Sequence, residues 1–495
     1  MKKTVLNEIR MMGMLLMAGG ALVACSSNDD LAQQPASVET PEVYNMTVVA
    51  QKGSDATMRS TLTDDGTTIK SVWDNTNDVI WVWNTTKDKK ATGVLEPDAA
   101  AATATLKGAL KKVTFEVNDQ VMMRTWESGA AVGNTTFKNG QKGTLADIGE
   151  NWDYCHQTGT VTAVDGSNVT IELNNDKKFE YDYAIVKFTL VDAADGTTPI
   201  KPTSLTVKAG TTDIVAMTSI PDETYTTNGG DGVLYVAVPA VASQDITLAA
   251  KVGYYTYTCT ASSKTFEAGH FYKVKAKMTK LVETFTTSTT EWKEGYTYVV
   301  PAGEFTINGQ VTITGNTTLE LTAGATLNIN GPVGTSAVSM TYSKTLTVFG
   351  TGTLNVKGAD GPDGNGTSSM DRKGSHAIWG NGYMIVDGGT ITATGGNGGK
   401  YTGTDSYRSA GSGGNGINIS LTVNGGKVTG IGGNGGAVET VGNPGSNGKA
   451  FYNGVTLGSN IKLYEGTDNT GTLLDGNTGS IRSKGYMSYQ KLHAE

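Results

Sequence analysis

The glycine-rich stretch "GADGPDGNG" (358–366) carries the side chains that come nearest to an ion-binding set. Asp360, Asp363 and Asn365 offer hard oxygen atoms of the kind that Ca²⁺ prefers. Their spacing is neither that of an EF-hand loop nor that of the calcium-binding nonapeptide repeat. One isolated calcium site is therefore an alternative here. The chain has four histidines, none at ligand spacing from a cysteine, so we predict no other metal site and no cofactor.

Catalysis on a polysaccharide is a second chemical alternative. Glycoside hydrolysis needs two carboxylates that face each other across the scissile bond. The candidate side chains lie mostly in expected turns or loops and form no recurring face: Asp360, Asp363, Asp371, His376, Asp387 and Arg408. No Gly-x-Ser-x-Gly or His-Glu-x-x-His motif is present. We predict that the protein is not an enzyme and keep a surface lyase or hydrolase as the alternative.

The sequence "GGNGG" occurs twice, at 395–399 and 432–436. A phosphate-binding loop would need Gly-x4-Gly-Lys-Ser/Thr, but Thr394 stands six residues before Lys400 and Tyr401 follows it. No helix is expected after the glycines to supply aligned N–H groups. Because glycine and asparagine tolerate positive φ, we predict that these residues turn corners between short strands.

The elements around these glycines recur at a fixed period. Thirty of the 99 residues from 350 to 448 are Gly, and Val348, Val386 and Val423 occupy equivalent places 38 and 37 residues apart. Repeated short strands of this kind bury a core only by stacking on one another. We therefore predict a parallel β-helix over 288–495, with loops such as 400–414 projecting from one side.

Aromatic side chains gather beside one of these loops. Exposed aromatic faces suit sugar rings or a protein partner, and an arginine lies next to them in sequence. The candidate ligand-binding residues are Trp379, Tyr383, Tyr401, Tyr407 and Arg408. In the alternative interpretation, Trp379 and Tyr383 simply fill the core or cap an edge.

The region from about 45 to 283 alternates between apolar and polar residues. In "VKFTLV", Val186, Phe188 and Leu190 share one face, as in a half-buried antiparallel strand. No helical stripe of comparable length exists, so we predict β-sandwiches at 45–176 and 177–283. Cys155 and Cys259 are two free thiols or one disulfide, and the sequence leaves both interpretations open.

The N-terminus has the pattern of a targeting segment. Lys2, Lys3 and Arg10 precede a short apolar run that ends at "LVAC". This resembles the lipobox of bacterial lipoproteins, which implies a signal peptide at 1–24, cleavage between Ala24 and Cys25, and acylation of Cys25. The acidic "SSNDD" that follows resembles the surface-export tag of Bacteroides-like lipoproteins. Residues 25–44 are polar and contain two prolines, which predicts a flexible tether.

The stretch "MRSTLTDDGTTIKSVWDNTNDVIWVW" (58–83) resembles the opening of the fimbrillin-like surface lipoproteins of Bacteroidales. "YAIVKFTL" and "FEAGHFYKVKAKM" are similar to the first and closing strands of that family's second domain, so the resemblance covers about 45–283. It implies two transthyretin-like β-sandwich domains and a role in pili or adhesion. In members that polymerise, cleavage after an arginine frees a groove for a donor strand from another pilus subunit. Arg59 is the candidate for such processing, and an exposed strand arginine is its alternative.

Together these patterns predict an all-β chain with two sandwiches followed by a right-handed parallel β-helix. We expect a lipid-anchored protein of the outer membrane surface, either a fimbrial tip or accessory subunit or a free-standing adhesin. It would bind a glycan or a host surface protein through the β-helix. A formal net charge of -8 argues against a nucleic-acid partner.

Overall fold

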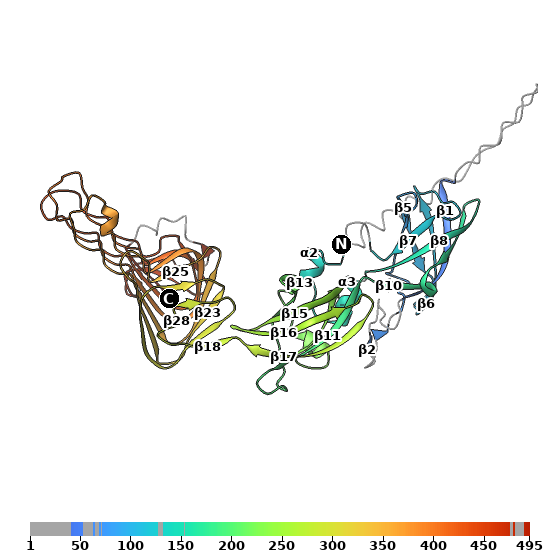
Figure 1. Cartoon of the computed structure of the whole chain (residues 1–495), viewed down its shortest axis with the longest axis horizontal. Coiled ribbons are helices and arrows are strands. Elements are labelled where there is room, and N and C mark those ends of the chain that lie inside the picture. Colours follow the sequence, from blue (N-terminus) through green and yellow to red (C-terminus); the bar gives the residue numbers. More distant parts are fainter. Residues whose placement is uncertain are drawn as a thin grey trace, which may run out of the picture. The chain divides into compact units, whose positions relative to one another are not determined.

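The protein is all-β in the computed structural model (Figure 1). The structure describes residues 41–52, 63–64, 69–70, 72–126, 132–152, 154–475, 479–480 and 490–495. Three large sheets follow one another along these residues. The all-β class predicted from the alternating pattern is therefore confirmed.

The first sheet has eight strands, and further pairings link β10 with β8 and β1 with β9. Its strand β1 alternates between buried and exposed side chains, and pairs with β6 from Val43↔Lys111 to Gln51↔Thr103. In spatial order the strands are β10 (Lys178–Tyr181), β1 (Val43–Lys52), β6 (Thr103–Lys111), β5 (Lys89–Pro97), β4 (Ile80–Asn84), β7 (Gln120–Arg124), β8 (Cys155–Asp165) and β9 (Asn168–Leu173). A small separate pair is formed by β2 (Thr63–Asp64) and β3 (Ile69–Lys70).

Two residues of the stretch 58–83 belong to the core of the first sheet. Trp73 is fully buried, and its indole N–H donates to the carbonyl oxygen of Ala50. The Asp78 carboxylate accepts a 2.6 Å hydrogen bond from the ammonium of Lys52, and both side chains are fully buried. A buried pair of this kind is costly to break because one charge would remain uncompensated. The motif thus has a structural role in this sheet.

The second sheet has seven strands and begins later than expected. β10 still pairs with β1 and β8 of the first sheet, so the chain changes sheet at Asp182 rather than at residue 177. Val186, Phe188 and Leu190 are buried on one side of β11, as predicted. In spatial order the strands are β13 (Thr212–Met217), β12 (Ser204–Ala209), β15 (Val241–Val252), β16 (Tyr255–Phe266), β17 (Phe271–Lys280), β11 (Tyr183–Asp192) and β14 (Val233–Pro239).

Short helices that the sequence analysis did not predict interrupt the strands. They are α2 (Thr135–Asn139), α3 (Leu145–Asn151) and α4 (Glu223–Thr227), with single turns η1 (Asn175–Lys177) and η2 (Ser369–Arg372). Asn134 and Thr144 cap the first two, because each side chain accepts an N–H of the first turn. Cys155 and Cys259 are both free thiols, one buried and the other half-buried. The disulfide alternative is therefore wrong.

The third sheet is made of parallel ladders in which each pass of the chain stacks on the one before. One ladder contains β19 (Glu291–Trp292), β22 (Val311–Ile313) and β25 (Val338–Met340). The second contains β18 (Val282–Thr284), β20 (Thr297–Val300), β23 (Thr317–Leu321) and β26 (Thr345–Gly350). The third contains β21 (Gly303–Asn308), β24 (Ala325–Asn330) and β27 (Thr353–Lys357). The long strands β28 (Ile378–Thr394) and β29 (Ile417–Ile431) continue all three ladders. The stacking begins at Val282, six residues before the predicted boundary at 288.

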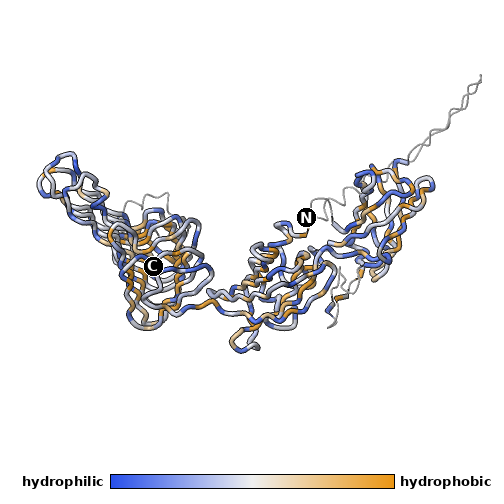
Figure 2. The backbone as a smooth tube through the Cα atoms, in the orientation of Figure 1, coloured by the Kyte–Doolittle hydropathy of each residue, from blue (hydrophilic) through white to orange (hydrophobic). Residues whose placement is uncertain are grey.

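The predicted register of the repeat is confirmed. Val348 pairs with Val386, Val386 with Val423, and Val423 with Leu457 of β30 (Val455–Leu457). All four side chains are buried in one continuous apolar core. Figure 2 shows this core as the orange part of the tube around the stacked strands. The stack ends with antiparallel strands, namely β31 (Leu463–Glu465), β32 (Leu473–Asp475), β33 (Gly479–Ser480) and β34 (Lys491–Ala494).

Candidate functional site

The glycine-rich segments that connect the strands of the third sheet along the chain form two layers of extended chain. Within a layer, the hydrogen bonds recur every third residue: the N–H groups of Gly358, Gly361 and Gly364 donate to Thr394, Asn397 and Lys400. The constant offset means that neighbouring segments run parallel, whereas the two layers run antiparallel to each other. We call the whole the glycine bundle, with layer A formed by 358–364, 394–400 and 431–437 and layer B by 372–377, 410–416 and 443–449.

This three-residue period is that of a polyproline II helix, which has three residues per turn and no internal hydrogen bonds. Glycine fills one or two positions of each turn, and at the tightest positions there is no room for a side chain. A Cβ on Gly396 would overlap the carbonyl oxygen of Ala359, and one on Gly398 would overlap that of Gly411. Figure 1 shows these segments as the orange strands of chain that project beyond the labelled strands of the third sheet.

The prediction that the "GGNGG" glycines turn corners by positive φ is wrong. None of the glycines at 395–399 or 432–436 is among the residues with positive φ. They lie in straight segments, and closeness to neighbouring backbone is what demands glycine there. Of the predicted loop 400–414, only residues 401–409 leave the bundle, since the N–H of Gly411 already donates to Gly399.

The third residue of each turn faces outward and carries the polar side chains of the bundle. On layer A, the Asp360 carboxylate accepts the N–H of Asn397 at 2.7 Å, and the Asp363 carboxylate accepts that of Lys400 at 2.6 Å. These two calcium candidates therefore bind backbone donors of the adjacent segment. No group of three or more His, Cys, Asp or Glu side chains that could hold a metal ion occurs among the described residues.

The far end of the bundle is held together by a buried arginine. The side chain of Arg372 is 2 % exposed, and it donates to the carbonyl oxygens of Gly366 at 2.9 Å and Ser409 at 2.7 Å. Its guanidinium carbon lies 5.0 Å from the centre of the Tyr401 ring, within the range of a cation–π contact. Arg372 thus joins two of the three loops that follow the bundle, 365–371 and 401–409. We call these two loops and 438–442 the tip loops.

The structure does not bring the five predicted ligand-binding residues together. Trp379 and Tyr383 lie on β28 within the stacked ladders and are about half exposed. Tyr401 begins a tip loop. It is separated from the end of β28 by the six residues 395–400, which span about 19 Å at ~3.1 Å per residue. It is 2 % exposed and therefore structural. The interpretation that Trp379 and Tyr383 fill the core is also wrong.

Two large apolar side chains of the tip loops are mostly exposed. Tyr407 is 92 % exposed and Met370 is 70 % exposed. Next to Tyr407, the Arg408 guanidinium pairs with Asp405 at 3.1 Å and donates to the carbonyl oxygen of Thr367 at 2.7 Å. Arg408 thus joins two tip loops. Sequence reasoning found Tyr407 through its aromatic neighbours but missed Met370, which no aromatic or charged pattern marks.

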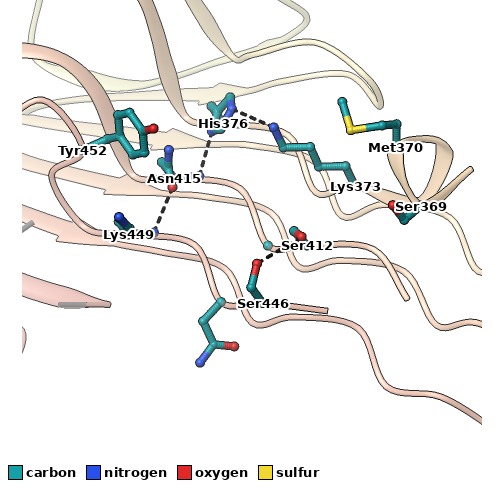
Figure 3. Close-up of a pocket in the computed structure, with 11 residues that line it drawn as sticks. Ser369, Met370, Lys373, His376, Ser412, Asn415, Ser446, Lys449 and Tyr452 are labelled. Atoms are coloured by element: carbon teal, nitrogen blue, oxygen red, sulfur yellow. Dashed lines mark hydrogen bonds between the residues drawn. The ribbon is translucent and has the colours of Figure 1, made fainter. Parts of the chain in front are cut away.

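A second surface feature lies along the outer side of layer B. It is a shallow groove of about 260 Å³. Figure 3 shows Lys373 and His376 near its middle, with Tyr452 and Lys449 toward one end and Met370 toward the other. We call it the layer B groove; its lining residues are Ser369, Met370, Lys373, His376, Ser412, Gly413, Asn415, Ser446, Asn447, Lys449 and Tyr452.

His376 is held as a neutral ring in this groove. Burial lowers the pKa of His376 to about 4, and the nearby Lys373 ammonium lowers this pKa as well. The backbone N–H of Asn415 donates to Nδ1 of His376 at 2.8 Å. Because a neutral imidazole has one acceptor nitrogen, Nε2 must carry the proton and act as a donor. His376 is therefore a hydrogen-bond donor toward the groove at neutral pH.

The remaining catalytic candidates do not form a site. The Asp387 carboxylate accepts from the side-chain amide of Asn424 at 2.8 Å on the stacked strands. Asp360 and Asp363 lie on layer A, and Arg408 lies in a tip loop. His376 lines the layer B groove, whose lining contains no carboxylate to act with it as acid and base.

The proposed N-terminal sites fall outside the described residues. These are Ala24 and Cys25 of the lipobox and Arg59 of the proposed processing site. Among the described ranges, no helix has the length and apolar character needed to cross a bilayer. Comparison of the chain with protein-family models and with curated proteins found no match.

Proposed function

We propose that this chain is a lipid-anchored surface adhesin, either free-standing or the tip or accessory subunit of a fimbria. In this proposal, Cys25 anchors the protein to the outer membrane and two fimbrillin-like, transthyretin-like sandwiches serve as the stalk or assembly module. The third sheet is a right-handed parallel β-helix that carries the glycine bundle. The tip loops then contact a glycan or a host surface protein.

The observation that carries the proposal is the construction of the tip. Straight segments joined by backbone hydrogen bonds every third residue form a stiff support, and Arg372 joins two of the loops at its end. Loops on a rigid support are the usual place for binding residues. Tyr407 and Met370 are too exposed to stabilise the fold, so their apolar surface is available to a partner.

Assembly into a pilus is supported by the place of β1. A cut after Arg59 would release the segment that contains Val43–Lys52, the strand that pairs with β6 over nine residues. Removal of β1 would leave a groove between β6 and β10, the two strands that flank β1 in the sheet. This groove would accept a donor strand from another subunit. Proteolysis of intact cells followed by N-terminal sequencing tests this step, since processed protein begins at Ser60 and unprocessed protein at an acylated Cys25.

An array of glycans and host surface proteins tests the adhesive role. The probe is the full mature chain with Cys25 replaced by Ser, as wild type and as the double variant Met370→Ser with Tyr407→Ser. The control is Tyr342→Ser, which removes an aromatic ring that is 78 % exposed outside the bundle. We expect the double variant to lose the signal and the control to keep it. Equal signals from all three proteins would contradict the proposal.

The alternative is a polysaccharide lyase or hydrolase on a β-helix scaffold. The layer B groove favours it only in part, because a groove is the shape that a polymer needs whereas the paired carboxylates of a hydrolase are missing from its lining. Release of new reducing ends or unsaturated products from acidic polysaccharides would establish it.

A further inference from the structure

The layer B groove combines positive charge with hydrogen-bond donors in a chain that is acidic overall. Its lining contains Lys373 and Lys449 but no Asp or Glu, whereas the whole chain has a formal net charge of -8. Among the described residues, neither ammonium forms an ion pair within the groove: Lys373 Nζ lies 3.3 Å from His376 Nε2, and Lys449 Nζ lies 5.2 Å from the centre of the Tyr452 ring. Two lysines that face solvent without a carboxylate form a local cationic surface.

The pair formed by Lys373 and His376 cannot be satisfied internally. Nδ1 of His376 is occupied by the N–H of Asn415, so Nε2 of the neutral ring carries a proton. The Lys373 ammonium is also a donor, and two donors that face each other at 3.3 Å do not bond. An oxyanion placed beside them would accept from both, and such charge-assisted bonds are stronger than neutral ones.

The other side chains of the groove fit a sugar rather than a bare anion. The hydroxyl of Ser446 donates to that of Ser412 at 3.1 Å, which leaves the Ser412 proton free to donate outward. Tyr452 is 42 % exposed and presents an aromatic face at one end of the groove. Aromatic faces and hydroxyls together are a surface that suits a pyranose ring with its own hydroxyl groups.

The geometry of layer B also suits an extended polymer. Outward residues on one segment recur every third position, as in Ser446 and Lys449, which corresponds to about 9 Å at ~3.1 Å per residue. The backbone bonds keep these positions fixed: Gly413 donates to Ser446 and Gly416 donates to Lys449. A rigid groove of this kind loses little conformational entropy when it binds an extended chain.

We propose that the layer B groove binds an acidic saccharide, whose carboxylate or sulfate accepts hydrogen bonds from Lys373 and His376 while a sugar ring packs on Tyr452. This inference deepens the proposed adhesive function and rests on it. It adds a second contact surface beside the tip loops and names its ligand class. Nucleic acid is the less favoured polyanion, because its phosphate backbone calls for many more cations than two lysines.

Titration of the full mature Cys25→Ser chain with four polymers tests the proposal. Polygalacturonate supplies carboxylates, chondroitin sulfate supplies sulfates as well, dextran is the neutral control, and duplex DNA is the non-saccharide polyanion. We expect binding to one or both acidic polysaccharides and none to dextran. The arm that binds identifies the acidic group. Binding to dextran as tight as to the acidic polymers, or DNA binding as tight as either, would overturn the inference.

Matched lysine variants locate the binding. Lys373→Gln should weaken binding about tenfold, as expected for loss of a charge-assisted hydrogen bond. Lys449→Gln should weaken it about two- to fivefold, because this lysine adds positive charge to the groove without a bond assigned to the acidic group. Lys400→Gln is the control: this lysine lies on layer A, pairs with Glu439, and is 38 % exposed. Its effect should stay within about twofold. Equal losses for Lys400→Gln and Lys373→Gln would overturn the assignment to this groove.

Two further measurements separate the inference from the proposed function. Amide hydrogen exchange across the bundle should be the same for wild type and each lysine variant, so that a weaker titration reports binding rather than unfolding. If the acidic polymers fail to bind while the array signal still depends on Met370 and Tyr407, the acidic-saccharide inference is wrong and the adhesive proposal stands. If both fail, the adhesive proposal is wrong too.

Discussion

The guanidinium of Arg372 lies against the ring of Tyr401, with 5.0 Å between the guanidinium carbon and the ring centre. Both side chains are 2 % exposed at the end of the glycine bundle. Tyr401 accepts the N–H of Asp405 through its hydroxyl at 3.2 Å, while Arg372 binds carbonyls on two different loops. These contacts therefore hold the loop 401–409 in place, and this loop exposes Tyr407.

Replacement of Arg372 by Met should loosen the tip loops. The carbonyls of Gly366 and Ser409 would lose their charged donor, which should cost about 3 kcal/mol locally. Hydrogen exchange of amides in 401–409 should accelerate, while amides of the first sheet should keep their rates. Arg372→Lys should recover only part of the loss, because an ammonium lacks the fork that reaches both carbonyls. Unchanged exchange in Arg372→Met would show that the arginine does not hold the loops.

A glycine-to-alanine pair tests the packing of the bundle. Gly396→Ala places a methyl group where the carbonyl of Ala359 lies and should destabilise the bundle by about 2–3 kcal/mol. Gly364→Ala is the matched control, because nothing lies within 4 Å of its added methyl group and its φ is not positive. It should be neutral or slightly stabilising. Exchange rates of bundle amides distinguish the two. Similar rates in both variants would disprove close packing at Gly396.

The stability of the bundle should fall on acidification because of His376. Its pKa is about 4 in the folded chain and about 6.5 in the unfolded chain, so the unfolded chain binds more protons between these values. Stability therefore rises with pH across this window and is lost as pH falls from about 6.5 to about 4, by at most about 3 kcal/mol. His376→Gln should remove this component, as measured by bundle amide exchange at pH 7 and pH 4.5. An identical pH dependence in both proteins would contradict the expectation.

Membrane attachment should depend on Cys25. If acyl chains on this residue anchor the protein, Cys25→Ala should move it from the membrane fraction to the soluble fraction, because each buried methylene contributes about 0.8 kcal/mol. Cys155→Ala serves as the control, since this buried thiol belongs to the first sheet. Continued membrane association of Cys25→Ala would refute the anchor.

Much of the strand structure could be predicted because it follows a local signal. Val186, Phe188 and Leu190 alternate with polar residues, and Val348, Val386 and Val423 recur at nearly equal spacing; both patterns were confirmed. A period of two or of 37 residues is visible in the sequence before any contact is known. The same holds for the all-β class.

The glycine bundle could not be predicted in the same way. Glycine at "GGNGG" satisfies a turn and a close-packed extended segment equally well, and only the neighbours decide between them. For Gly396 the deciding neighbour is Ala359, 37 residues away. Arg372 gave no signal either, because its burial depends on loops from different passes of the chain. The prediction of Tyr401 as a ligand-binding residue is wrong for the same reason.

Adhesion of whole cells tests the central claim most directly. Adherent bacteria would be counted on a surface coated with acidic polysaccharide and host surface protein. Three strains are compared, which display the wild-type chain, the triple variant (Met370→Ser, Tyr407→Ser and Lys373→Gln) or the control (Tyr342→Ser with Lys400→Gln). Equal display is verified by an antibody against the first sheet. The account predicts that the triple variant adheres no better than cells without the protein, whereas the control adheres like wild type. Full adhesion by the triple variant would contradict it.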